Sequence, residues 1–323
     1  MRGGGICMNF KCSHRNAPRA KREQMLIGTD FRAAMRGRAT RGIKEALFRA
    51  VFAVAAMAAI VAVGLICVFL FAGGVPAMGK IGVLRFLTGT QWKPTYDEYG
   101  ILPMIVGSIY VTAGAMLFGV PVGIFTAVFM ARICPKTLYR FLKPALNLLA
   151  GIPSVVYGFF GMSILVPLVR NTFSGSNGNS ILTASLLLGI MILPTIIGVS
   201  ESALRAVPCE LYEGAVALGA SHDRAVFAVV LPAAKSGVMA AVVLGVGRAI
   251  GETMAVKMVA GNQTVLRAPL EFLSGVRTLT ANVVLEMGYA EGLHREALVA
   301  TGVVLFVFIL LINVLFSAVK KRA

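Results

Sequence analysis

Residues Glu213–Pro232 read EGAVALGASHDRAVFAVVLP and separate two long apolar segments of the chain. Gly219 favours a turn within this stretch, because glycine readily adopts the left-handed backbone conformation that ends a helix. Ser221 can then cap a second short helix by accepting a backbone hydrogen bond. An apolar helix face precedes the turn, with the spacing of Leu211, Ala215 and Leu218. We therefore predict two short helices joined at Gly219, between the apolar segments.

The composition of the chain indicates a membrane protein. Hydrophobic residues make up 57% of the 323 residues, charged residues 14%, and the mean hydropathy is +0.81. A soluble domain of this length could not bury so much apolar surface, so lipid must be the solvent. The formal net charge of +17 is concentrated near the N-terminus, where residues 1–50 hold 12 Lys and Arg against three acids. We therefore assign the charge to a basic tail near membrane lipid, not to a nucleic-acid partner.

Six runs of the sequence are long and apolar enough to cross a bilayer, which takes about 20 residues. They are Ala50–Gly79, Tyr99–Ala131, Pro144–Val169, Asn171–Ser200, Ser236–Val259 and Ala297–Val319. The predicted fold class is an all-α membrane protein with about six transmembrane helices.

Basic residues predict the orientation of these helices, because cytoplasmic loops carry an excess of Lys and Arg. If the N-terminus is cytoplasmic, the segments on its side hold 22 Lys and Arg, against seven on the other side. Both termini and the Glu213–Pro232 stretch are therefore predicted to be cytoplasmic.

One apolar run contains charged residues in its interior. Arg248 lies 12 residues after Ser236, or about 18 Å along a helix, near the middle of the bilayer. A lone charge there costs several kcal/mol, so a partner is expected, and Glu252 is four residues away on the same helix face. Two interpretations remain open. Either the two side chains only neutralise each other, or Arg248 lines a path and offers hydrogen-bond donors to a tetrahedral oxyanion.

Catalytic and metal-binding patterns are missing from the sequence. The five cysteines form no CxxC pair, and there is no HExxH or GxSxG motif. His222 and His294 are expected to be solvated. The run Gly74–Lys80 approaches a phosphate-binding loop, but Ile81 stands where the Mg²⁺-binding hydroxyl is needed. We predict that the chain is not an enzyme and holds no cofactor or metal.

The spacing E-x-A-x3-G-x9-[I/V]-x-L-P resembles the EAA loop by which permease subunits of ABC importers dock on their ATPase. Gly214 and Val229 depart from the usual Ala and Ile. The resemblance assigns ATPase coupling to Glu213, Gly214, Ala215, Gly219, Leu231 and Pro232. Three further runs are similar to PstC-type permease subunits of phosphate importers: GRAIGETMAV from Gly247, IPSVVYG from Ile152 and FLTGTQW from Phe86.

This resemblance implies a type-1 ABC-importer permease fold in the bacterial inner membrane. It implies phosphate as the substrate. Because ionisable residues within membrane helices usually serve a function, we predict that Arg248 and Glu252 are residues of the translocation path. The implied partners are a second, PstA-like permease subunit, a PstB-like ATPase dimer that binds ATP and Mg²⁺, and a periplasmic phosphate-binding protein.

The predicted organisation has four parts. A basic, disordered cytoplasmic tail covers residues 1–46, a first transmembrane helix 47–72 and a periplasmic loop 73–100. A permease domain follows at residues 101–319, in which residues 205–235 form the coupling loop. Two alternatives remain for the function. One is a permease for sulfate or molybdate, and the other is a secondary anion transporter, which would leave the coupling loop unexplained.

Overall fold

The computed structural model describes residues 31–173, 175–266 and 271–322 and divides into two units, Met1–Cys67 and Val68–Ala323. Helix α1 (Phe31–Ile81) begins in the first unit and ends in the second. Its apolar side chains in the first unit are exposed, from Leu47 onwards. Residues 1–30 of the predicted tail lie outside the described residues, and the rest of that tail forms the first turns of α1.

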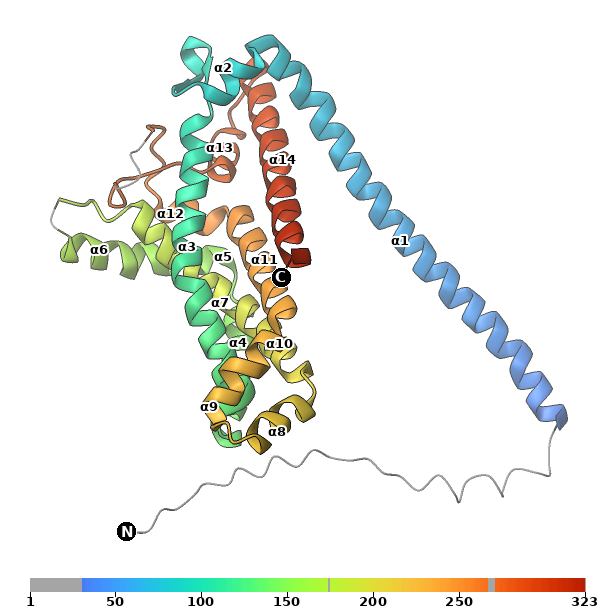
Figure 1. The fold of residues 1–323 in the computed structure, drawn as a ribbon. Helices are drawn as coiled ribbons and strands as arrows, with labels where there is room; N and C mark the ends of the chain where they lie inside the picture. Colours follow the sequence, from blue (N-terminus) through green and yellow to red (C-terminus); the bar gives the residue numbers. More distant parts are fainter. Residues whose placement is uncertain (1–30, 174, 267–270, 323) are drawn as a thin grey trace, which may run out of the picture. The chain divides into compact units, whose positions relative to one another are not determined.

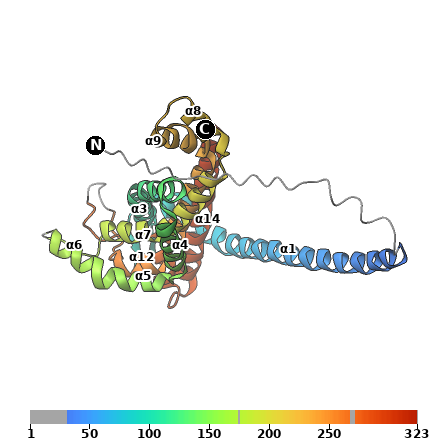
Figure 2. The same cartoon turned by 90° about the horizontal axis from the view of Figure 1, so that it is seen from below.

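The second unit consists mainly of helices (Figures 1 and 2). After α1 come α2 (Val83–Thr88), a hairpin of β1 (Trp92–Lys93) and β2 (Glu98–Tyr99), α3 (Leu102–Val128), the π-helical η3 (Phe129–Ile133), α4 (Lys136–Gly151), α5 (Ser154–Phe160), the π-helical η4 (Gly161–Leu165), α6 (Val166–Thr172) and α7 (Ile181–Ala206). The chain continues with α8 (Cys209–Ala217), α9 (His222–Ala225), the π-helical η5 (Val226–Val230), α10 (Leu231–Ala233), α11 (Lys235–Gly251), α12 (Met254–Val259), α13 (Leu279–Glu286) and α14 (Gly292–Arg322).

Five helical stretches among the described residues are long and apolar enough to cross a membrane. They are Glu45–Ile81, Leu102–Ile133, Ser154–Thr172, Ile181–Ala206 and Gly292–Leu315. A sixth crossing is available from the pair His222–Ala233 and Lys235–Gly251, which meet at a bend of 69°. The predicted all-α fold with about six membrane helices is therefore confirmed.

Two of the predicted runs are interrupted in the structure. The run Pro144–Val169 begins within α4 and resumes in α5, because Pro153 forces the preceding residue into an extended conformation. The run Ser236–Val259 leaves the helix after Gly251, and Glu252 is extended, with φ −71° and ψ 127°. A long apolar run therefore predicts a membrane segment but does not predict an unbroken helix.

Helix α7 forms the centre of the second unit, and α3 packs along it (Figure 1). Glycines on α3 allow the two backbones to approach closely. A Cβ atom on Gly123 would lie 2.7 Å from Cγ2 of Ile196, and one on Gly119 would lie 2.7 Å from Cδ1 of Ile192. Lipid supplies no hydrophobic force between membrane helices, so such close contacts are an important source of their attraction.

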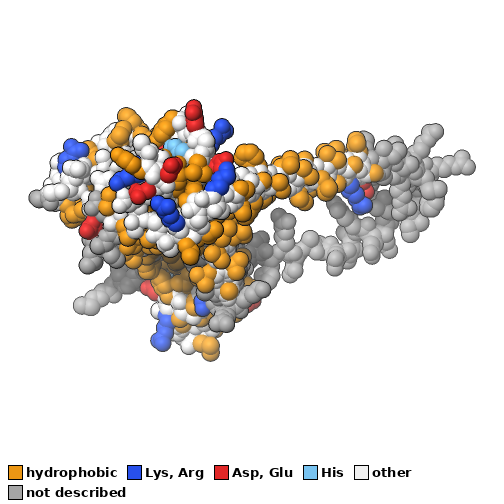
Figure 3. All heavy atoms as spheres, turned by 90° about the horizontal axis from the view of Figure 1, so that it is seen from above, with side chains coloured by type: hydrophobic (Ala, Val, Ile, Leu, Met, Phe, Trp, Pro, Cys, Tyr) orange, Lys and Arg blue, Asp and Glu red, His pale blue; other side chains and the backbone are white. Residues whose placement is uncertain are grey.

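The two ends of this unit carry different structures. Helices α8 and α9 lie at the lower end in Figure 1, whereas α2 and the start of α14 lie at the upper end. The segment predicted as a loop, residues 73–100, is ordered there as the end of α1, α2 and the β1–β2 hairpin. Figure 3 looks onto the upper end and shows acidic and basic side chains interspersed on it, above mainly hydrophobic flanks.

Candidate functional site

The loop that joins α8 and α9 has the conformation that its sequence predicts. Gly219 has φ +89°, in the left-handed region, and a Cβ atom built there would meet no other atom within 4 Å. A side chain at this position is therefore disfavoured by backbone strain and not by crowding. Ser221 caps α9, since its hydroxyl accepts a hydrogen bond from the backbone N–H of Arg224 at 3.4 Å.

Side chains of the loop also hold its two helices together. The Tyr212 hydroxyl and Nδ1 of His222 are 2.8 Å apart, and the two rings meet edge to face. His222 was expected to be solvated; it is exposed but also engaged in this contact. Tyr212 packs against the apolar core at this end of the unit. The loop is therefore a preformed unit, stabilised by its own contacts.

The outer surface of α8 is apolar and largely uncovered. Leu218 is 92% exposed and Leu211 45% exposed. Beside them lies a groove of about 570 Å³, whose lining includes three of the predicted coupling residues: Gly214, Ala215 and Gly219. The other three predicted residues lie outside this lining. Glu213 is exposed on α8, Pro232 is exposed on α10, and Leu231 packs against the core.

The predicted ion pair between Arg248 and Glu252 is wrong. Helix α11 ends at Gly251, so the four-residue spacing no longer brings the two side chains to one helix face. Arg248 instead donates from Nη1 to the Thr195 hydroxyl of α7 at 3.1 Å. Glu252 accepts a hydrogen bond from the backbone N–H of Ala255 at 3.3 Å, at the start of α12. Among the described residues, Arg248 has no carboxylate partner.

The break between α11 and α12 is held by another helix. The Thr280 hydroxyl of α13 donates to the backbone carbonyl of Glu252 at 3.2 Å. This bond satisfies a carbonyl that the interrupted helix leaves without an intrahelical partner. Non-helical backbone at membrane depth is tolerated where it is buried in protein or lines a cavity.

Arg248 lies beside open space. It is half-buried, and Cβ atoms on the neighbouring Gly247 and Gly251 would meet no atom within 4 Å. The same holds for Gly198, one turn after Thr195 on α7. An arginine in a membrane helix is costly unless it faces protein or water. This side of the unit therefore suits a polar lumen better than lipid.

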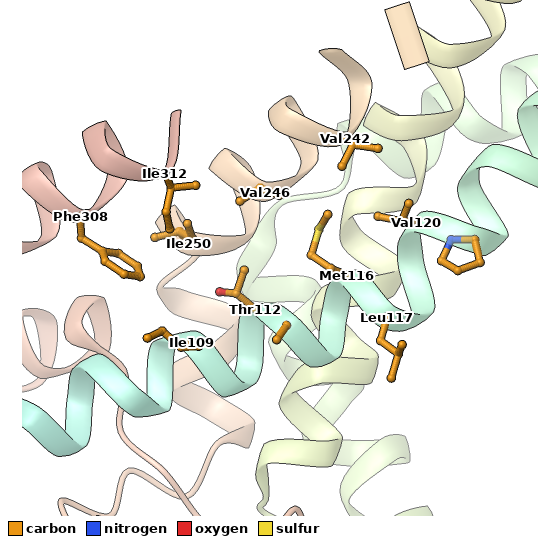
Figure 4. Close-up of a pocket in the computed structure, with 12 residues that line it drawn as sticks. Ile109, Thr112, Met116, Leu117, Val120, Val242, Val246, Ile250, Phe308 and Ile312 are labelled. Carbon is orange, nitrogen blue, oxygen red and sulfur yellow. The ribbon is translucent and has the colours of Figure 1, made fainter. Parts of the chain in front are cut away.

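An apolar groove of about 620 Å³ lies elsewhere, between α3, α11 and α14 (Figure 4). Its lining includes Met116 of α3, Ile250 of α11 and Phe308 of α14, and no charged residue. Ile250 is two residues after Arg248, so the two side chains point to nearly opposite sides of α11. This groove cannot stabilise an anion and is not a candidate for its path.

A buried charge cluster fastens the end of α7 that leads to α8. Glu201 is 1% exposed and receives hydrogen bonds from three side chains. Lys143 and Tyr139, both on α4, lie at 2.7 and 2.8 Å, and Arg205 lies at 2.8 Å. Arg205 also donates to the carbonyl of Met130 at 3.0 Å. The cluster joins α4, α7 and η3 near the end of α7, which leads to α8.

This cluster was not predicted from the sequence, in which its basic residues served only as indicators of orientation. One signal was available: Glu201 is the first residue after the apolar run that ends at Ser200, and Arg205 follows it at helical spacing.

A second buried cluster surrounds Glu286 at the other end of the unit. Its carboxylate accepts hydrogen bonds from Trp92 at 2.8 Å and from Arg277, and Nε2 of His294 lies 2.9 Å away. Burial alone would raise the pKa of Glu286, but these hydrogen bonds outweigh it and hold the pKa below its ordinary value. His294 has a side chain only 14% exposed, so the expectation that it is solvated is wrong.

Comparisons with known proteins identify relatives of the chain. Residues 119–323 match the family described as binding-protein-dependent transport system inner membrane component. The chain is 40% identical over 293 residues to the probable ABC transporter permease protein YqgH of Bacillus subtilis. The aligned region covers 88% of this chain and 94% of that protein. It is 35% identical over 290 residues to the phosphate transport system permease protein PstC of Mesorhizobium japonicum, covering 84% and 88%.

A solved structure shares the fold. The inward-facing MetNI methionine ABC transporter has a chain with a TM-score of 0.58 and 19% identity, covering 72% of this chain and 99% of that chain. At that identity the likeness shows the fold alone, and it confirms the predicted ABC-importer permease architecture. This multi-pass membrane chain therefore belongs to the family of binding-protein-dependent transport system inner membrane components, and within it to the PstC type.

Proposed function

We propose that this chain is a permease subunit of an ATP-driven phosphate importer in a bacterial inner membrane. The observation that carries the proposal is Arg248, a half-buried arginine beside open space that has no carboxylate partner among the described residues. A guanidinium in that setting can donate several hydrogen bonds to a tetrahedral oxyanion. The naming of relatives as phosphate transport permeases supports phosphate as that anion.

The translocation path lies between this chain and a second, PstA-like permease subunit. Arg248 is half-buried beside open space in its own unit, and a second subunit would cover it and complete a lumen. Glu252 lies at the break next to this path. The negative charge of Glu252 weakens the binding of an anion at Arg248. A permeating ion needs such a weak site, because it must be able to leave.

ATP and Mg²⁺ bind to a separate PstB-like ATPase dimer, on which the α8–α9 loop docks. The exposed Leu218 and the groove lined by Gly214, Ala215 and Gly219 offer the contact surface. The Glu201 cluster ties α7 and α4 together near the end of α7 that leads to this loop. Movement of the loop would therefore be passed to α7, which carries Thr195 and contacts Arg248.

This scheme requires both termini and the α8–α9 loop to be cytoplasmic, and the β1–β2 hairpin to face a periplasmic phosphate-binding protein. Reporter fusions after Lys136 and His222 should be active only as cytoplasmic reporters. Fusions after Gly178 and Gly288 should be active only as periplasmic reporters. A cytoplasmic signal at Gly288 would contradict the proposed number of crossings.

The substrate can be tested by uptake. Cells without their own phosphate importer would receive this chain together with its second permease subunit, ATPase and binding protein. We expect ATP-dependent uptake of labelled phosphate that a large excess of sulfate or molybdate does not reduce. Uptake of sulfate or molybdate in place of phosphate would favour the alternative oxyanion permease. Uptake that persists without the ATPase subunit would favour a secondary transporter.

A further inference from the structure

We propose that Thr195 of α7 is a second residue of the oxyanion site, in which it orients Arg248 and donates a hydrogen bond of its own to the anion. The inference rests on the proposed role of Arg248 in a phosphate path. It begins from one hydrogen bond, which joins Nη1 of Arg248 to the Thr195 hydroxyl at 3.1 Å.

The direction of this bond leaves the hydroxyl hydrogen of Thr195 available. A guanidinium has no acceptor, so Arg248 is the donor and the oxygen of Thr195 is the acceptor. The hydroxyl must therefore direct its own hydrogen elsewhere. Nothing else in the described part of the chain is hydrogen-bonded to the Thr195 side chain.

Several other helical hydroxyls among the described residues behave differently. Five of them donate to the carbonyl one turn earlier in their own helix, at 2.7 to 2.9 Å: Thr88, Ser108, Thr172, Ser202 and Thr301. Back-bonding of this kind is the usual arrangement for Ser and Thr within helices. Thr195 lacks it, which indicates that its hydroxyl is turned toward Arg248 and away from the backbone.

The surroundings leave room for a ligand at this pair. Thr195 and Arg248 are both half-buried, and Gly198 follows Thr195 by one turn on α7. Cβ atoms on Gly198, Gly247 and Gly251 would meet no atom within 4 Å. An anion that enters this space can therefore meet the guanidinium of Arg248 and the hydroxyl of Thr195 together.

A neutral donor suits a permeation site. It adds a directed hydrogen bond without adding positive charge, so the anion can still leave. It also fixes one branch of the guanidinium and presents the remaining donors to the anion. Loss of a hydrogen bond to a charged group corresponds to a change of roughly tenfold to a hundredfold in an equilibrium constant.

The test compares three threonine variants in the full importer, reconstituted in proteoliposomes with its binding protein and ATPase. Thr195→Val keeps the shape but removes the hydroxyl, and Thr195→Ser restores it. Thr301→Val is the matched control, because the hydroxyl of Thr301 is buried and bonded within its own helix. The measurements are the rate of phosphate transport, the phosphate transported per ATP hydrolysed, and the amount of assembled complex.

We expect Thr195→Val to lower both transport and phosphate moved per ATP, by roughly tenfold or more. Thr195→Ser should recover most of the loss, and Thr301→Val should match the wild type. Wild-type transport by Thr195→Val would overturn the proposal. So would a defect that Thr195→Ser shares, because the hydroxyl would then not be the cause.

Thr195→Ala covers the case in which Thr195→Val does not assemble. If both variants fail to assemble while Thr195→Ser assembles, the residue is structural and the proposal is overturned. Arg248→Gln separates this inference from the proposed function. If Arg248→Gln stops transport and Thr195→Val does not, only the inference fails. If Arg248→Gln transports normally, the path role of Arg248 fails as well.

Discussion

The α8–α9 loop and the α11–α12 break are both short interruptions between helices, but they are stabilised in different ways. The loop is held by its own residues, through Gly219, the Ser221 cap and the contact between Tyr212 and His222. The break has a local bond from the backbone N–H of Ala255 to Glu252, but it is also held by another helix, because the Thr280 hydroxyl of α13 donates to the carbonyl of Glu252. The loop can therefore move as a preformed piece, whereas a change at the break requires a change in its packing against α13.

The largest effect is expected at the break. Arg248→Gln should reduce phosphate uptake by roughly a hundredfold, since the anion loses a charged donor in the membrane. Glu252→Gln should be milder, because Ala255 can still donate to the amide oxygen. The double variant should remain as defective as Arg248→Gln, since the two residues form no ion pair. Full uptake in the double variant would show instead that the charges only neutralise each other.

A smaller effect is expected in the loop. Gly219→Val places a branched side chain at φ +89°, which costs at least about 1–2 kcal/mol and distorts the turn. We expect roughly tenfold slower uptake with normal insertion and weaker binding of the ATPase. Gly288→Ala is the control, because its Cβ would also meet no atom within 4 Å but its φ is ordinary. Normal ATP-driven uptake by Gly219→Val would refute the coupling role of the loop.

The Glu201 cluster tests whether the loop depends on the helices beneath it. Glu201→Gln leaves Lys143 and Arg205 without a counter-charge at the end of α7. Their side chains are 35% and 44% exposed, so water screens part of the loss and about 1–3 kcal/mol of stability should disappear. The measurement is the thermal unfolding of the purified complex, with uptake per assembled complex as a second readout. Unchanged unfolding would mean that the cluster does not stabilise this end.

The smallest effect is expected at Glu286 and depends on pH. Its folded pKa is below the ordinary value of 4.5, so its interactions stabilise the fold fully above that value and are lost as the pH falls from 4.5 through the lower folded pKa. Glu286→Gln should lower the unfolding temperature at neutral pH. It should also flatten the decline in unfolding temperature that occurs as the pH falls below about 5. An equally steep decline in the variant would assign the acid sensitivity to other groups.

Local rules predicted the loop well and the break poorly. A left-handed Gly219 and a capping Ser221 depend on a few neighbouring residues, so the sequence of the loop was sufficient. The pairing of Arg248 with Glu252 assumed an unbroken helix. The backbone instead leaves the helix after Gly251, and the carbonyl of Glu252 is bound by Thr280, which lies much later in the chain. The bond between Arg248 and Thr195 could not be predicted for the same reason, since it requires the packing of α7 against α11.

The sequence also did not predict which charged and polar side chains are buried. The number of membrane helices follows from the length of apolar runs, and the structure confirms it. Whether a polar side chain near the end of a run is solvated depends on which helices meet there. His294 was expected to be solvated and no prediction was made for Glu201, although both belong to hydrogen-bonded clusters in which Glu201 is buried and His294 is mostly covered.

The exposed Leu218 has a consequence for the life of the protein in the cell. A leucine that is 92% exposed on a protruding turn would make an unassembled copy prone to aggregation and attractive to chaperones and proteases. Binding of the ATPase that we propose to dock there would remove that signal. The steady-state amount of this chain should therefore follow the supply of its partner, so that surplus copies are degraded and the subunits remain in balanced numbers.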